Sequence, residues 1–251
     1  MKKRHLFETR ENVKTRENVK TREKFFSTLL LATMALAFLV SCATSITFED
    51  ETEEYDYALH YALNSSNESA ISTLYFKVTE ASSFIPASLT YIQDNASQIP
   101  GMSKLLAEWT AYMNAYSLQR FEGVRTHLNA TASAMAFDNP IDLVSQSDDS
   151  ASVAYEAAFG AEIKLYLRQE LNDVNLSKWE ELAAQYRAWV ETRKVLFDED
   201  NVQLEEINIL DELAEHISSL YFASLKEAEI LFRTTPDPNA DKTVSKVFGL
   251  E

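Results

Sequence analysis

Cysteine, glycine and proline are scarce in this 251-residue chain, which holds one cysteine, four glycines and five prolines. A lone cysteine cannot form an intramolecular disulfide, so packing of a core has to stabilise the fold. Few glycines and prolines mean few helix breaks and few of the tight turns that short strands need. The scarcity therefore favours long helices over a β architecture.

Sequence patterns of common catalytic and metal sites are also missing. The chain has no Gly-x-Ser-x-Gly elbow, no phosphate-binding loop, no dinucleotide fingerprint and no His-Glu-x-x-His motif. Asp237, Asn239 and Asp241 match the first ligands of a calcium loop, but Lys242 replaces its glycine and Phe248 its bidentate glutamate. We therefore predict no metal and no cofactor. We favour a protein without enzymatic activity, although the sequence leaves that question open.

In two places a carboxylate and an imidazole lie one helical turn apart in the sequence. These pairs are Asp56 with His60 and Glu212 with His216. If the two pairs faced each other on neighbouring helices, they could hold a metal ion between them. The chain has only four histidines, however, and His5 lies in the N-terminal segment. Surface pairing or contact with a helix end is the favoured interpretation.

The longest apolar run, residues 25–40, is shorter than the roughly 20 residues that a membrane-spanning helix needs. It follows a basic stretch and ends in Leu39-Val40-Ser41-Cys42, which resembles a bacterial lipobox. We predict that residues 1–41 are a lipoprotein signal peptide, with cleavage before Cys42. An uncleaved anchor is the alternative.

Cys42 is the predicted site of lipid attachment. In lipoproteins with such a lipobox, the thiol carries diacylglycerol and the freed amine is acylated. Each buried methylene contributes about 0.8 kcal/mol, so two or three chains give stable anchoring. Ala43 follows the cysteine, a pattern that resembles sorting to the outer membrane. We expect a lipid-anchored protein of the cell envelope, with the outer membrane favoured.

The formal net charge of the full chain is −16. Cleavage of residues 1–41 would remove nine basic and four acidic residues, so the mature chain would carry −21. A surface with this much negative charge repels nucleic-acid phosphates, which excludes nucleic acid as a partner. The acidic run 49–56 is interpreted as part of a solvated tether. We predict a lipidated acidic tether at 42–52 and one helical domain at 53–251.

Apolar residues recur at helical spacing beyond the tether, as in Trp109, Tyr112, Met113 and Tyr116. Breaks such as Pro100-Gly101 and Asn139-Pro140 separate these stripes. The pattern predicts an all-α fold, a single bundle of about seven or eight helices. Aromatic stripes of this kind are interpreted as core, with a ligand groove as the alternative. Ser147 or Ser150 is expected to cap the helix that runs toward residue 171.

Two segments resemble the bacterial family called domain of unknown function 4197. The first is the stretch from Met135 to Tyr155, and the second runs from Tyr221-Phe222 through Arg233 and Pro236 to Lys246-Val247-Phe248-Gly249. The resemblance extends over about residues 85–250. It implies a helical, secreted or lipid-anchored protein and implies no activity.

Glu227, Glu229 and Arg233 lie in the second segment and are the predicted ligand-binding residues. Glu229 and Arg233 are spaced i, i+4, which on an exposed face contributes only about 0.3–0.5 kcal/mol. Buried between helices, the same pair would fix the packing or anchor a ligand. We favour a non-enzymatic domain that binds a protein, a peptide or an apolar ligand, with an envelope hydrolase that uses Asp/Glu pairs as the alternative.

Overall fold

The computed structural model describes residues 48–79, 85–86, 89–197, 208–235 and 241–250. The chain divides into two compact units, residues 1–48 and Glu49–Glu251, and the second, here called the helical unit, is described by itself. The predicted signal peptide and Cys42 lie outside the described residues. No helix in these ranges is long and apolar enough to span a membrane.

Helices form nearly all of the described chain, and no strand occurs in the described ranges. In chain order the elements are α2 (Glu51–Thr79), α3 (Thr90–Asn95), the 3-10 helix η3 (Ala96–Gln98), α4 (Met102–Ser133), α5 (Pro140–Gln146), α6 (Ser150–Glu170), α7 (Ser177–Phe197), α8 (Ile209–Thr234) and α9 (Lys242–Val247). The predicted all-α fold with about seven or eight helices is confirmed.

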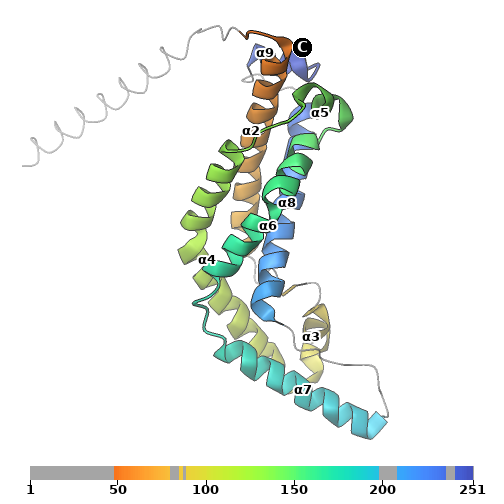
Figure 1. The fold of residues 1–251 in the computed structure, drawn as a ribbon. Helices are drawn as coiled ribbons and strands as arrows, with labels where there is room; N and C mark the ends of the chain where they lie inside the picture. The colour runs from red at the N-terminus through yellow and green to blue at the C-terminus, as the bar shows by residue number, and fades with distance from the viewer. Residues whose placement is uncertain (1–47, 80–84, 87–88, 198–207, 236–240, 251) are drawn as a thin grey trace, which may run out of the picture. The chain divides into compact units, whose positions relative to one another are not determined.

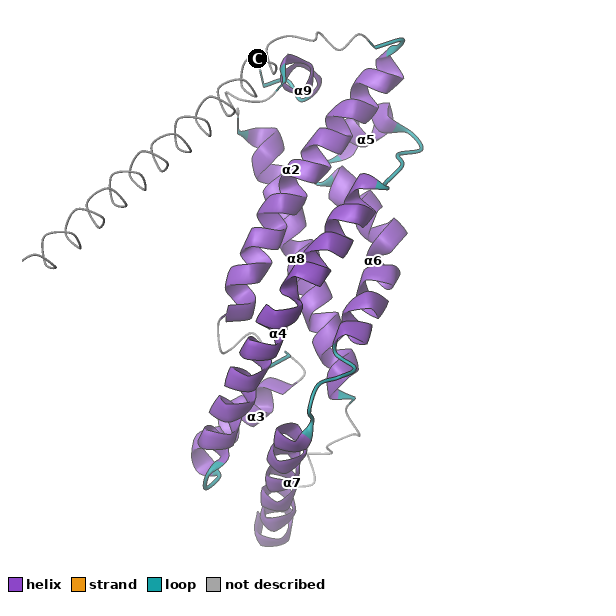
Figure 2. Ribbon diagram, turned by 90° about the vertical axis from the view of Figure 1, so that its left-hand side faces the viewer, coloured by secondary structure: helices purple, strands orange, loops and turns teal. Residues whose placement is uncertain are grey.

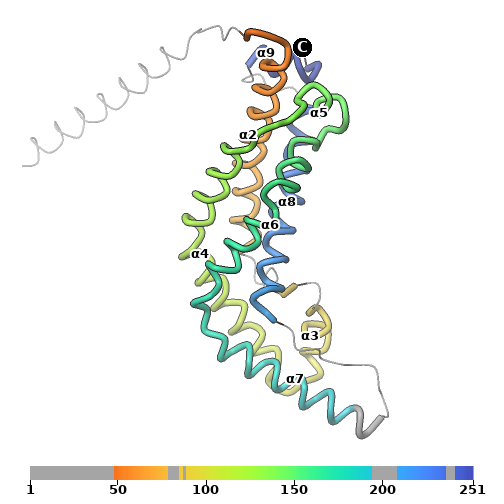
Figure 3. Tube along the Cα trace, viewed as in Figure 1, coloured from red at the N-terminus to blue at the C-terminus, as the bar shows by residue number. Residues whose placement is uncertain are grey.

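The long helices α2, α4, α6 and α8 form an antiparallel four-helix bundle (Figures 1 and 2). Helix α2 packs on both α4 and α8, and α6 packs on α8. The chain direction alternates along the bundle, as the colours of the tube show (Figure 3). At one end lie the start of α2, the end of α8, and the short helices α5 and α9; this is called the α5/α9 end.

The core is a continuous cluster of aliphatic and aromatic side chains contributed by every long helix. Trp109, Tyr155 and Tyr221 are among its largest fully buried members. All the buried apolar residues of the described ranges lie between Ala58 and Val244, so the helical unit carries its own core. The aromatic stripe at 109–116 is split. Trp109 and Met113 are buried, whereas Tyr116 is only partly buried.

Helix α7 covers the first half of α4, away from the α5/α9 end (Figure 1). The rings of Trp109 and Trp179 lie 5.7 Å apart, and those of Tyr91 in α3 and Tyr186 in α7 lie 5.3 Å apart. Such tilted aromatic pairs combine a large buried area with favourable ring geometry. Aromatic packing thus holds α3 and α7 on the end of the bundle.

A seam of hydrogen-bonded polar side chains crosses the buried interface of α2, α4 and α8. The Tyr221 hydroxyl donates to Asn67 Oδ1 at 2.6 Å, and Asn67 Nδ2 donates to Asn129 Oδ1 at 2.6 Å. Burial raises the pKa of Tyr221 far above its ordinary value. Buried polar groups are tolerated when they are paired, so this seam fixes the register of three helices.

Most helix starts follow from local sequence. Gly101 precedes α4 with φ +81°, a left-handed conformation that glycine adopts without steric cost. Pro140 is the first residue of α5, where its missing amide is harmless, and the Asn139 side chain accepts from the Asp142 amide. Helix α2 begins at Glu51, so most of the acidic run expected in a solvated tether lies in its first turns. Acidic residues at a helix start interact favourably with the helix dipole.

Candidate functional site

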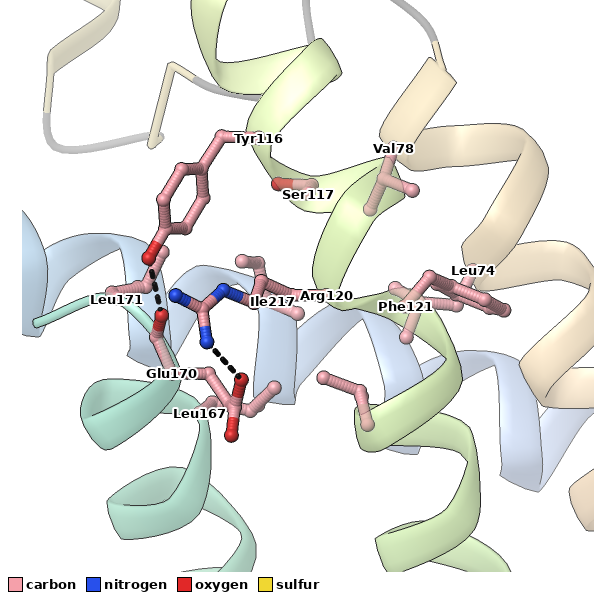
Figure 4. A pocket seen from close by; sticks show the side chains of 11 residues that line it. Leu74, Val78, Tyr116, Ser117, Arg120, Phe121, Leu167, Glu170, Leu171 and Ile217 are labelled. Atoms are coloured by element: carbon pink, nitrogen blue, oxygen red, sulfur yellow. Dashed lines mark hydrogen bonds and ion pairs between the residues drawn. The ribbon is translucent and has the colours of Figure 1, made fainter. Parts of the chain in front are cut away.

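An apolar pocket lies between α2, α4, α6 and α8, at the last turns of α2 and α6 and the middle of α4 (Figure 4). Its enclosed volume is about 40 Å³, within about 430 Å³ of empty space that includes open solvent. We call it the bundle pocket. It is lined by Leu74, Val78, Tyr116, Ser117, Arg120, Phe121, Val124, Leu167, Glu170, Leu171 and Ile217. Seven of these residues are aliphatic or phenylalanine, which makes the wall suited to an apolar group.

The polar groups of the bundle pocket gather at one edge, where α4 faces the end of α6. Arg120 Nη1 lies 3.7 Å from Glu170 Oε2, and Arg120 Nη2 donates to Asp173 Oδ2 at 3.2 Å. The Tyr116 hydroxyl donates to the backbone carbonyl of Glu170 at 2.7 Å, and the Arg120 guanidinium lies 5.5 Å from the Tyr116 ring centroid. Burial raises the pKa of Tyr116, so its hydroxyl is a neutral donor at pH 7. The edge therefore holds one cation, Arg120, and two carboxylates, Glu170 and Asp173, beside an apolar wall.

The predicted residues Glu229 and Arg233 lie elsewhere, fully enclosed near the α5/α9 end. Their side chains are 0% and 2% exposed, and Arg233 Nη2 pairs with Glu229 Oε1. Arg233 Nη1 also donates to the backbone carbonyl of Ser147 at 3.1 Å. Burial lowers the pKa of the Arg233 guanidinium, and the neighbouring Glu229 carboxylate opposes that shift. Of the two alternatives for this pair, the structure shows burial between helices.

Glu229 also caps a helix that is distant from it in sequence. Its Oε1 accepts from the Ala151 amide at 3.1 Å and its Oε2 accepts from the Ser152 amide at 2.6 Å. These are the second and third residues of α6, whose amides have no partner within their own helix. A carboxylate there satisfies two donors and interacts favourably with the helix dipole.

The prediction that Ser147 or Ser150 caps α6 is wrong. The N-cap residue is Asp149, whose side chain makes no capping hydrogen bond. Ser147 Oγ donates to Asp149 Oδ1 at 2.7 Å, and Ser150 Oγ donates to the Leu143 carbonyl at 2.5 Å. Both hydroxyls are engaged in the turn between α5 and α6, so the cap comes from α8 instead.

Arg233 joins the C-terminal helix to this cluster. Its guanidinium lies 4.7 Å from the ring centroid of Phe248, which directly follows α9. Lys246 Nζ in α9 donates to Glu54 Oε1 in α2 at 2.7 Å. The two segments that carry the family resemblance therefore meet in space at the ion pair of Glu229 and Arg233.

Glu227 does not join this cluster, because it is exposed on α8. Residues two apart on a helix point about 200° away from each other, which separates Glu227 from Glu229. None of the three predicted residues lines the bundle pocket. Their role in ligand binding stays a prediction, and the contacts of Glu229 and Arg233 described above are all with protein groups.

Within the described ranges, no three or more His, Cys, Asp or Glu side chains are grouped closely enough to hold a metal ion. His60 of the first predicted pair has Nδ1 2.9 Å from the Asp56 carbonyl and Nε2 2.8 Å from the Met135 carbonyl. Its ring also packs edge-on against Phe137 at 4.9 Å. His60 thus connects α2 to the turn before α5.

Arg120 and Glu170 are not among the residues predicted from the sequence. Their spacing in the chain carries no motif, since they lie on different helices and meet only when α4 and α6 pack together. The one local signal is that Arg120 follows Tyr116 by one helical turn, on the edge of an aromatic stripe. That signal alone does not distinguish a pocket from an ordinary helix surface.

Comparison with known proteins gives a family and no activity. Neither the curated proteins nor the solved structures include a match to the chain. A family model described as "Protein of unknown function (DUF4197)" matches residues 49–249, which covers the helical unit almost completely. The chain therefore belongs to the DUF4197 family.

Proposed function

We propose that this protein is a lipid-anchored, non-enzymatic binding protein of the bacterial cell envelope, attached through Cys42, and that its helical unit binds a small apolar ligand. The observation that carries the binding role is the bundle pocket. Ligand pockets are typically concave and apolar, with a few polar groups at one edge, which matches this wall and its Arg120 edge. The lipobox-like residues 39–42 support the anchoring.

The chemistry of the pocket wall favours binding over hydrolysis. An acid–base hydrolase needs two carboxyl groups about 5–10 Å apart on either side of the bond that is cleaved. Glu170 is the one carboxylate among the residues that line the bundle pocket, and it faces Arg120. Glu229, the buried carboxylate described above, already accepts from two backbone amides and pairs with the Arg233 guanidinium. These contacts support a binding role.

A substitution that fills the pocket should abolish binding. Ser117 is half-buried on the pocket wall, so the indole of Ser117→Trp would occupy the space of the ligand. The probe is 1-octanol, titrated by calorimetry into residues 49–251, which contain the whole described core. We expect at least a tenfold loss of octanol affinity, because an apolar tail cannot share the volume of an indole.

Gln119→Trp is the matched control, since Gln119 is exposed two residues further along α4 and does not line the pocket. It should bind octanol like the unmodified unit. Circular dichroism checks that both variants keep their helices. Equal octanol binding by both variants, or no octanol binding by the unmodified unit, would contradict the proposed function.

A further inference from the structure

We propose that His60 is a pH-sensitive link between α2 and the turn after α4, residues 134–139. With its proton, the ring donates from both nitrogens and holds the turn on α2. Without the proton, one of the two hydrogen bonds is lost and the turn opens more often. The inference goes beyond the proposed function, because it depends neither on the bundle pocket nor on Cys42.

Both ring nitrogens of His60 face oxygen atoms that can only accept a hydrogen bond. Nδ1 lies 2.9 Å from the Asp56 carbonyl oxygen, and Nε2 lies 2.8 Å from the Met135 carbonyl oxygen. A neutral imidazole has one N–H donor, so in either tautomer the other nitrogen points its lone pair at a carbonyl oxygen. The imidazolium has two N–H donors. It is therefore the one protonation state that satisfies both contacts.

The charge in contact with the His60 ring also favours the imidazolium. Asp56 Oδ2 lies 3.3 Å from Nδ1, and an opposite charge at this distance stabilises the protonated form. The last turns of α4, residues 128–133, carry no charge. The turn, α5, α9 and the end of α8 carry the other charged groups at this end of α2, which are Asp138, Asp142, Asp241, Lys242, Lys246 and the pair of Glu229 and Arg233. Lys242 is exposed and Lys246 is bound to Glu54, so neither is placed to displace the proton.

The link holds a segment on which the α5/α9 end depends. Met135 and Phe137 are the buried residues of the turn, and the Phe137 ring packs edge-on against His60 at 4.9 Å. Helix α5 begins directly after the turn, with Asn139 as its N-cap. Imidazole changes its charge between about pH 5 and pH 8. A histidine that gains hydrogen-bond partners on folding adds stability at low pH, and this stability is lost as the pH rises. The turn and α5 should therefore loosen toward high pH.

Nuclear magnetic resonance of residues 49–251 can follow the ring and the turn in one series from about pH 5.5 to about pH 8. The nitrogen shifts of His60 report its protonation. Amide protection factors, corrected for the intrinsic effect of pH on exchange, report opening at Met135 and Leu143, whose amides donate to backbone carbonyls. We expect both protection factors to fall about three- to tenfold as His60 loses its proton, the effect of one lost hydrogen bond. The Glu180 amide in α7 is the internal reference and should keep its protection.

His60→Gln tests the assigned residue directly, because glutamine does not titrate and the protection of the turn should become independent of pH. His127→Gln is the matched control, since His127 stacks on Tyr166 between α4 and α6 and should leave the pH dependence unchanged. Should His60→Gln lose its helical structure, Asp56→Asn replaces it. That variant keeps the ring but removes the carboxylate, so the turn should open at lower pH. Protection that stays constant while His60 titrates, that falls equally in His60→Gln, or a ring that is neutral throughout the series would overturn the inference.

Discussion

Replacing Glu229 by glutamine should lower the free energy of unfolding by about 3–5 kcal/mol, which is the usual cost of removing one partner of a buried ion pair. The side chain is completely buried, and its two oxygens serve three donors, the amides of Ala151 and Ser152 and the Arg233 guanidinium. The neutral amide would leave the Arg233 charge enclosed without a counter-ion. Urea denaturation followed by circular dichroism measures the change.

Glu227→Gln is the matched control for this prediction. It makes the same chemical change two residues away on α8, at an exposed position. Its effect should stay within about 0.5 kcal/mol, as for most surface substitutions. Replacing Glu229 and Arg233 together by methionine should lower the free energy of unfolding by less than the sum of the two single substitutions. The reason is that the double substitution leaves no buried charge without a partner. Similar stabilities of the Glu229→Gln and Glu227→Gln variants would contradict the role assigned to the buried pair.

Cys42→Ser should abolish fatty-acid labelling of the protein completely. A serine hydroxyl cannot form the thioether to diacylglycerol, and without that step the later cleavage and acylation do not follow. A strongly acidic domain has no electrostatic attraction to an anionic bilayer, so lipid is the proposed source of attachment. The measurements are metabolic labelling with a fatty acid and separation of membrane from soluble fractions.

Ser41→Ala is the matched control for the lipidation prediction. It changes the neighbouring position but keeps a small residue before the cleavage point, so labelling and the membrane fraction should both persist. A Cys42→Ser protein that still carries the fatty-acid label would contradict lipid attachment at Cys42.

The helices could be predicted because their signals are local. Gly101 and Pro140 mark helix starts through their own backbone preferences, and the buried Trp109 and Met113 follow from their spacing. The cap of α6 could not be predicted in this way. Ser150 has the residue type of a cap, but the amides of α6 are bonded by a carboxylate more than seventy residues away.

The candidate site was harder to predict for the same reason. The i, i+4 spacing of Glu229 and Arg233 is equally compatible with an exposed and a buried pair, and only the packing of α8 on α6 shows that it is buried. Arg120 and Glu170 become neighbours through packing of α4 on α6. Cys42 is the opposite case, because the lipobox pattern depends on local sequence alone.

The interior of the four-helix bundle, and not its surface, is the proposed binding site of an apolar ligand. Isotope-filtered nuclear Overhauser effects between unlabelled 1-octanol and labelled residues 49–251 test it most directly. The structure predicts contacts from the octanol methyl group to the methyl groups of Leu74, Leu167 and Ile217, which line the bundle pocket. Contacts confined to exposed apolar side chains such as Phe76 and Leu231, with none to the pocket, would contradict the claim.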